Sequence, residues 1–228
     1  MLRRALERLP RPWRVALDWI VTILAAVGLV LAVKAWVVNP YRIPSASMEP
    51  TLHCARPAPG CLARFSDRVL ANRFVYHFRS PHRGEIVVFR APDAAARAGC
   101  AEPGDTFVKR LIGLPGDRVR EDAHGALLVD GRKLREPYVE PIRRAADRKY
   151  RGGSWRVPPH EYFMVGDNRG QSCDSRAWGA VPRANVIGEV FATYWPVNRI
   201  STNLLVTAGV VVFLALVLAY VRRRRQRH

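Results

Sequence analysis

Residues 43–50 read IPSASMEP and place two serine hydroxyls, on Ser45 and Ser47, one residue apart in a short segment. A serine hydroxyl can attack a carbonyl carbon, but only when a neighbouring group removes its proton. The segment is therefore a candidate nucleophile site if the chain supplies a suitable base. The alternative is a turn whose hydroxyls bond nearby backbone groups.

Composition narrows the search for that base. Of the 37 Lys and Arg residues only four are lysines, at positions 34, 109, 133 and 149. Arginine stays protonated at any working pH, so a cationic residue acting as general base has to be a lysine. Lys34 lies at the end of an apolar run, while Lys133 and Lys149 lie in charged stretches typical of solvated surface.

Lys109 lies in the strand-like stretch FVKRLI. Strand alternation predicts Phe107, Lys109 and Leu111 on one face and residues 108, 110 and 112 on the other. An amine held between Phe107 and Leu111 would lose hydration, which lowers its pKa and makes it a competent base near neutral pH. The alternative is an edge lysine whose stem covers apolar surface.

The elements that would position these residues are short strands. Apolar stretches rich in β-forming residues alternate with turns at residues 68–78, 85–90, 106–112, 126–132, 161–167 and 189–195. This spacing predicts a mainly β fold with an antiparallel catalytic domain. Strand signals are weakest within residues 132–160, so residues 118–160 are interpreted as a small subdomain or insertion.

Two apolar runs, Val15 to Val38 and Leu204 to Val221, flank this β region. Each approaches the roughly 20 residues that a helix needs to cross about 30 Å of hydrocarbon. Residues 15–38 and 204–221 are therefore predicted to be one N-terminal and one C-terminal transmembrane helix. The alternatives are buried core helices and, for the first run, a secretory signal peptide cleaved after Ala35.

Charge predicts the orientation. Arginines at positions 3, 4, 8, 11 and 14 precede the first run, and RRRRQRH follows the second. Because positive residues stay on the cytoplasmic side, residues 1–14 and 222–228 are predicted to be cytoplasmic. Residues 39–203 would then form an extracytoplasmic domain of a two-pass protein of the cell membrane.

The formal net charge of +18 raises the question of nucleic-acid binding. Half of that excess lies in the two short terminal segments beside the apolar runs. The remaining basic character is compatible with membrane lipid as a partner. The middle region lacks the interleaved aromatic residues of a nucleic-acid platform, so no nucleic-acid partner is expected.

Four cysteines, at positions 54, 61, 100 and 173, fall in the predicted outer region. That compartment permits disulfides, and four cysteines allow three pairings. Cys54 and Cys61 enclose ARPAPG, a loop that a local bridge could close. No CxxC pair or His/Cys cluster indicates a metal, and neither a metal nor a cofactor is expected.

Three longer motifs carry a family resemblance. IPSASMEPTL, FVKRLIGLPGD and GDNRGQSCDSRAWGAVP, with RGEIVVF and DRVL between them, resemble the conserved boxes of type I signal peptidases, the bacterial leader peptidase family. The resemblance covers most of residues 40–197. It implies a membrane-bound Ser-Lys serine protease with an antiparallel β catalytic domain. Its substrates would be exported preproteins with Ala-x-Ala-type signal peptides.

The resemblance also implies roles. Ser47 matches the nucleophile and Lys109 the general base, and Ser45 matches a hydroxyl that forms the oxyanion hole with the Ser47 backbone N–H. Ser172 matches a serine that orients the lysine. Supporting positions of the late motif are Asp167, Asn168, Asp174 and Arg176. Positions lining the substrate pocket are Ile43, Pro44, Met48, Leu52, Phe107 and Val108.

The chain departs from familiar members in two ways. Some of them cross the membrane twice at the N-terminus, whereas this chain is predicted to cross once at each end. Cys173 is an uncommon residue within the late motif.

Three rival functions remain at this level. A self-cleaving Ser-Lys protein of the repressor type would be cytoplasmic, which the two apolar runs disfavour. A membrane-anchored β module that binds envelope proteins would not depend on Ser47. A Ser-His protease would need a histidine in a catalytic motif, and none of the six histidines lies in one.

Overall fold

The computed structural model describes residues 38–201 apart from 103, and residues 10, 12, 13, 15, 19–24 and 28. The chain divides into two units, Met1–Asn39 and Pro40–His228. Most of the first predicted transmembrane run and all of the second lie outside the described residues. Within the described part, no helix combines the length and apolarity needed to span a bilayer.

The larger of two sheets has seven strands. They are β1 (Val38–Arg42), β2 (Arg68–Asn72), β3 (Ile86–Arg90), β4 (Thr106–Gly113), β9 (Glu161–Val165), β10 (Val181–Pro182) and β11 (Val186–Trp195). Their order across the sheet is β1-β2-β11-β3-β4-β9-β10. From β2 to β10 every neighbouring pair is antiparallel. The prediction of a mainly antiparallel β domain is confirmed.

Strand β2 is shorter than the predicted stretch 68–78. The Asn72 side-chain carbonyl accepts hydrogen bonds from the backbone N–H groups of Phe74 and Val75. An asparagine that bonds the following backbone in this way favours a turn over further strand pairing. The chain accordingly leaves the sheet and forms a 3-10 turn at Val75–His77.

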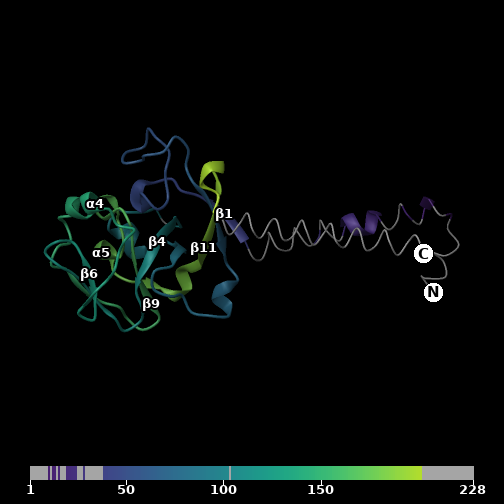
Figure 1. Cartoon of the computed structure of the whole chain (residues 1–228). Helices are drawn as coiled ribbons and strands as arrows, with labels where there is room; N and C mark the ends of the chain where they lie inside the picture. Colours follow the sequence, from purple (N-terminus) through teal and green to yellow (C-terminus); the bar gives the residue numbers. More distant parts are fainter. Residues whose placement is uncertain are drawn as a thin grey trace. The chain divides into compact units, whose positions relative to one another are not determined.

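The second sheet is built from residues 118–156 alone. It contains β5 (Arg118–Glu121), β6 (Leu127–Val129), β7 (Arg132–Lys133) and β8 (Ser154–Arg156), in the order β7-β6-β5-β8. Val119 and Leu127 pack in one core with Ile112 of β4 and Phe163 of β9, so the small sheet rests on the large one. Helix α4 (Pro141–Ala146) lies between β7 and β8 in sequence. Strand β6 and helix α4 lie at the end of the domain away from β11 (Figure 1).

Short helices fill the connections. Helix α3 (Asp93–Arg97) lies between β3 and β4, and α5 (Ser175–Trp178) follows β9. The 3-10 turns are η1 (Ala46–Met48), η2 (Val75–His77), η3 (Arg169–Gln171), η4 (Arg183–Asn185) and η5 (Val197–Arg199). The main core contains Phe89, Leu111 and Met164 from the sheet and Trp178 from α5.

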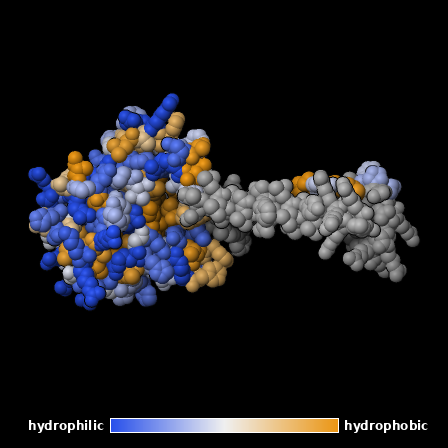
Figure 2. Space-filling view, in the orientation of Figure 1, coloured by the Kyte–Doolittle hydropathy of each residue, from blue (hydrophilic) through white to orange (hydrophobic). Residues whose placement is uncertain are grey.

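Two disulfides close the connections, one between Cys54 and Cys61 and one between Cys100 and Cys173. The first joins the ends of the local loop noted in the sequence. The second joins residues 73 positions apart. The face of the domain that Figure 2 shows is mostly hydrophilic, and its apolar residues lie in separate groups.

Candidate active site

Ser47 and Lys109 meet although 62 positions separate them in the sequence. Ser47 is the central residue of η1, just after strand β1, and Lys109 lies in β4. Both side chains are buried, and Lys109 Nζ lies 2.6 Å from Ser47 Oγ. At this distance a neutral amine can accept the serine proton directly.

The surroundings of Lys109 are apolar. Its neighbour across the sheet is the buried Val87, and its Nζ lies 5.2 Å from the centroid of the Phe107 ring. Burial lowers the pKa of Lys109 to about 8, opposed by the charge of Asp174 and assisted by that of Arg176. A substantial fraction of the amine is therefore neutral at mildly alkaline pH.

This pKa predicts the pH dependence of catalysis. Only the neutral amine can act as base, so kcat/KM should rise about tenfold per pH unit below the pKa and level off above it. The midpoint should lie near pH 8, the pKa that burial gives Lys109. Initial rates measured with one preprotein from about pH 6 to about pH 10 give the profile. A profile that is flat, or that falls with rising pH, would contradict a lysine base.

Ser45 lies beside the nucleophile. Its Oγ is 3.3 Å from Ser47 Oγ, and either hydroxyl can donate. The Ser45 backbone is extended, and its side chain is exposed next to the buried Ser47. The hydroxyl is thus free to turn toward a group that approaches Ser47.

The segment 166–172 braces the turn that carries Ser47. The Asn168 backbone N–H donates to the Ser47 carbonyl at 3.0 Å, and its side-chain amide donates to the Ala46 carbonyl at 2.9 Å. Gly166 permits this close approach, because a Cβ there would lie 2.5 Å from the Ser47 carbonyl oxygen and 2.2 Å from Ser172 Oγ. The late motif therefore packs directly on the backbone of the nucleophile.

Ser172 occupies a buried position in the same segment. Among the described residues its hydroxyl has no hydrogen-bond partner, Lys109 included. The hydroxyl lies beside the Asp174 carboxylate and helps to lower the pKa of that carboxyl group. The two side chains do not have the geometry of a hydrogen bond. The role of Ser172 in orienting the lysine remains a prediction.

Asp174 and Arg176 form a buried ion pair at 2.9 Å. Burial alone would raise the pKa of Asp174, but the charge of Arg176 and the hydrogen bonds to the carboxylate hold it below its ordinary value. The carboxylate also accepts the backbone N–H of Gly166 at 3.1 Å. Asp174 is therefore charged and fixed close to the segment that contacts Ser47.

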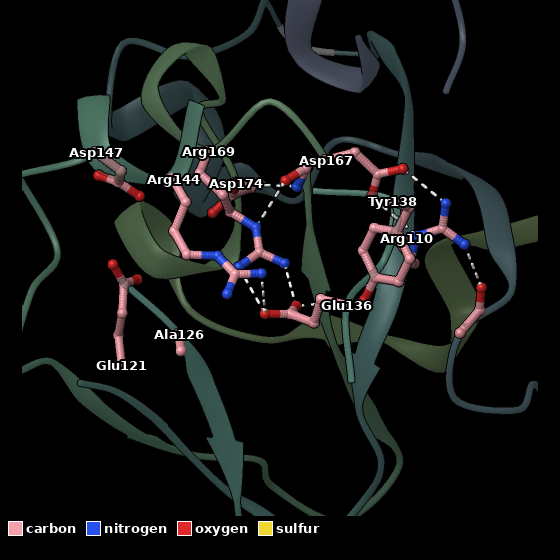
Figure 3. A network of polar contacts seen from close by, with 12 residues as sticks. Arg110, Glu121, Ala126, Glu136, Tyr138, Arg144, Asp147, Asp167, Arg169 and Asp174 are labelled. Carbon is pink, nitrogen blue, oxygen red and sulfur yellow. Dashed lines mark hydrogen bonds and ion pairs between the residues drawn. The ribbon is translucent and has the colours of Figure 1, made fainter. Parts of the chain in front are cut away.

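Further buried ion pairs lie in this part of the domain, and Figure 3 shows those that Arg110 and Arg169 make. Arg110 pairs with Asp167 at 2.6 Å, and Arg169 pairs with Glu136. Arg176 also contacts Asp147 and, at 3.3 Å, Glu121. We call these contacts the arginine frame, which consists of Arg110, Arg169, Arg176 and the carboxylates of Glu121, Glu136, Asp147, Asp167 and Asp174.

The frame contains residues that sequence reasoning missed. They are Arg110, Arg169 and three acids, of which Glu121 ends β5 and Glu136 and Asp147 lie between β7 and β8. A signal existed in the late motif, where Arg169 and Arg176 lie seven positions apart in the polar stretch that directly follows the apolar strand 161–165. Buried charges require partners, so acids from elsewhere in the chain had to meet them.

The six residues matched to the substrate pocket separate into two groups. Ile43, Met48 and Leu52 are buried in one apolar cluster around η1, with Val108 packed against it. Phe107 instead stacks on Trp178, with 5.4 Å between the two ring centroids, and Pro44 is exposed. Within the residues that the structure describes, no three His, Cys, Asp or Glu side chains group to hold a metal ion.

Comparison with known proteins assigns the family. A family model described as signal peptidase, peptidase S26, matches residues 16–195. The chain belongs to the signal peptidase family. Members of this family are serine endopeptidases that remove signal peptides from exported proteins, and this is the activity of the chain.

Individual signal peptidases agree with this assignment. A probable signal peptidase I-2 of Synechocystis sp. is 40% identical over 180 residues, which cover 79% of this chain and 73% of the relative. Signal peptidase I of Leptolyngbya laminosa is 36% identical over 185 residues, covering 81% and 82%. Signal peptidase I of Mycobacterium tuberculosis is 33% identical over 231 residues, covering 83% and 76%. Signal peptidases of this family are typically anchored in a membrane.

Proposed function

We propose that Ser47 is the nucleophile and Lys109 the general base with which this peptidase cleaves signal peptides. The observation that carries this proposal is the 2.6 Å contact between a buried amine and a buried hydroxyl. Among the lysines of the described residues, Lys133 and Lys149 are exposed and have no serine partner.

The geometry supports a mechanism in steps. Neutral Lys109 takes the Ser47 proton while the serine oxygen attacks the scissile carbonyl carbon, which forms a tetrahedral intermediate. The Ser47 backbone N–H and the Ser45 hydroxyl stabilise the oxyanion, and a single donor of this kind typically contributes about 10²–10³ in rate. Protonated Lys109 then gives its proton to the leaving amine and the acyl-enzyme forms. In deacylation Lys109 removes a proton from the attacking water.

Supporting roles follow from position. Asp167, Asn168, Asp174 and Arg176 hold the late segment against the nucleophile turn, and Ser172 orients Lys109 once substrate is bound. The apolar cluster of Ile43, Met48, Leu52 and Val108 forms the wall of pockets for small side chains, and Pro44 and Phe107 line its edges. Such pockets favour alanine at two positions before the cleaved bond, because larger side chains would overlap the walls.

The membrane arrangement is also part of the proposal. Residues 15–38 and 204–221 form transmembrane helices, residues 1–14 and 222–228 lie in the cytoplasm, and residues 39–203 lie outside. Ser47 lies nine positions after Val38, and nine positions of extended chain reach at most about 30 Å. Ser47 therefore acts near the outer face of the cytoplasmic membrane, where signal peptides end. Membrane lipid is the other partner, and no nucleic acid is involved.

Cleavage of a defined preprotein tests this function. The purified full chain in detergent should cut a preprotein after its Ala-x-Ala sequence, leaving the mature N-terminus that Edman or mass analysis can read. A matched preprotein with phenylalanine in place of the last alanine should be cut at least about 10²-fold more slowly, because the large ring cannot enter a small pocket. Equal cleavage of both preproteins would contradict the proposed pockets, and cleavage of neither would contradict the proposed function.

A further inference from the structure

The Cys100–Cys173 disulfide ends inside the late motif. Cys173 lies between Ser172 and Asp174, and its Cα is 5.9 Å from the Cα of Cys100. That separation lies within the range of about 4.4–6.8 Å that disulfides require. The disulfide therefore holds Cys173, and its two sequence neighbours, Ser172 and Asp174, lie beside the catalytic pair.

Little else holds this part of the loop. Within the described chain, the backbone groups of Ser172 and Cys173 make no hydrogen bond. The neighbouring residues differ, since Asn168 bonds the Ser47 turn and Asp174 caps α5. The side chain of Cys173 is only partly buried against the main core. The Cys100–Cys173 disulfide is thus the main connection between residues 172–173 and another part of the fold.

The other end of the disulfide is firmly placed. Cys100 follows α3, and its backbone N–H donates to the Ala95 carbonyl at 3.0 Å. Ala95 is fully buried in the main core. The connection that contains Cys100 closes where Ala91 N–H donates to the Asp105 carbonyl at 2.8 Å, and β4, which carries Lys109, begins at the next residue. The disulfide therefore joins the connection leading to Lys109 with the loop that carries Ser172.

Small displacements at this place reach the nucleophile. A Cβ on Gly166 would lie 2.2 Å from Ser172 Oγ and 2.5 Å from the Ser47 carbonyl oxygen, so these groups have no free space between them. A misplacement of about 1 Å in a catalytic site can lower the rate about 10²-fold. Loss of the tie at Cys173 would permit such a misplacement.

We propose that the Cys100–Cys173 disulfide is a positioning element of the catalytic site, so that full activity requires its oxidised form. It holds Ser172 and Asp174 against the Ser47–Lys109 pair and deepens the function proposed above, on which it rests. A dithiol such as dithiothreitol supplies the two electrons and two protons that convert the disulfide to two thiols, and is itself oxidised to a cyclic disulfide. Reduction should leave a folded peptidase with a loosened late loop.

The experiment compares oxidised and reduced full-length protein in detergent. Dithiothreitol should lower kcat at least about tenfold. In the Cys54→Ala/Cys61→Ala protein it should also leave KM within about twofold, because Cys54 and Cys61 belong to the cluster of pocket residues whereas Cys100 and Cys173 pack against the main core. The midpoint of the pH profile should move up, because a loosened loop admits water to Lys109. Circular dichroism should show an unchanged fold, and reoxidation with glutathione disulfide should restore the rate. A fall in rate that only follows the loss of folded protein would overturn the proposal.

Variants separate the two disulfides. Cys100→Ala with Cys173→Ala should be slow and insensitive to dithiothreitol. Cys54→Ala with Cys61→Ala keeps the proposed element and should still lose at least about tenfold in kcat on reduction, whatever its oxidised rate. Equal rates for wild type and the Cys100/Cys173 variant, or free Cys100 and Cys173 thiols in the active protein, would overturn the proposal. The rate of the oxidised wild-type protein tests the proposed function by itself. The disulfide is tested separately, by the ratio of the reduced or variant rate to that oxidised wild-type rate.

Discussion

Replacing Ser47 with alanine should lower the rate of preprotein cleavage by about 10⁴-fold or more, because no other hydroxyl can form the acyl-enzyme. Ser45 carries a neighbouring hydroxyl, but Lys109 is hydrogen bonded to Ser47 and no such bond joins it to Ser45. The loss should appear in kcat, since the pocket residues remain in place. The measurement is single-turnover cleavage of a labelled preprotein by purified wild-type and Ser47→Ala protein.

Ser66→Ala is the matched control for that substitution. Ser66 is as buried as Ser47, and its hydroxyl accepts a hydrogen bond from the Ala55 backbone far from Lys109 in sequence. This variant should lose some stability and retain cleavage within a few-fold of wild type. If Ser47→Ala cleaved as well as Ser66→Ala, Ser47 would not be the nucleophile.

Replacing Lys109 with arginine should lower cleavage by about 10⁴-fold although the formal charge is retained. Arginine does not lose its proton near the operating pH, so Ser47 would have no base. Lys133→Arg on the exposed strand β7 is the matched control, and it should cleave at the wild-type rate. Rates of both variants at several pH values give the comparison.

Lys109→Met completes the test by removing the amine without adding bulk or charge. It should be as inactive as Lys109→Arg while keeping the fold, because methionine suits a position flanked by Phe107 and Val87. Cleavage within tenfold of wild type by Lys109→Arg, over the same pH range, would remove Lys109 from the role of base.

Local sequence patterns predicted the position of Lys109 and the antiparallel sheet. The alternation in FVKRLI placed Lys109 on the same face as Leu111, and both are buried in the structure. Only four lysines occur, and Lys109 is the main candidate base from sequence because it alone lies in an apolar strand-like stretch. The antiparallel sheet followed from strand spacing, whereas the early end of β2 depends on one side chain, Asn72, which accepts hydrogen bonds from the backbone N–H groups of Phe74 and Val75.

The long-range contacts could not be predicted in the same way. Glu136 pairs with Arg169 across 33 positions, and Cys100 with Cys173 across 73. With so many arginines and three ways to pair four cysteines, the sequence offers several partners for each group, and only the packed fold selects one. The roles matched by resemblance for Ser172 and the pocket residues remain predictions that the variants above can test.

The arginine frame has a consequence for working conditions. Its three cations, Arg110, Arg169 and Arg176, are guanidinium groups that keep their protons in alkaline solution, where Lys109 is deprotonated. Raising the pH therefore switches the base on without dissolving the ion pairs that hold the late loop. A lysine in place of any of these arginines would lose its proton at a lower pH than a guanidinium does, so the scaffold would loosen at an alkaline pH that the native ion pairs withstand.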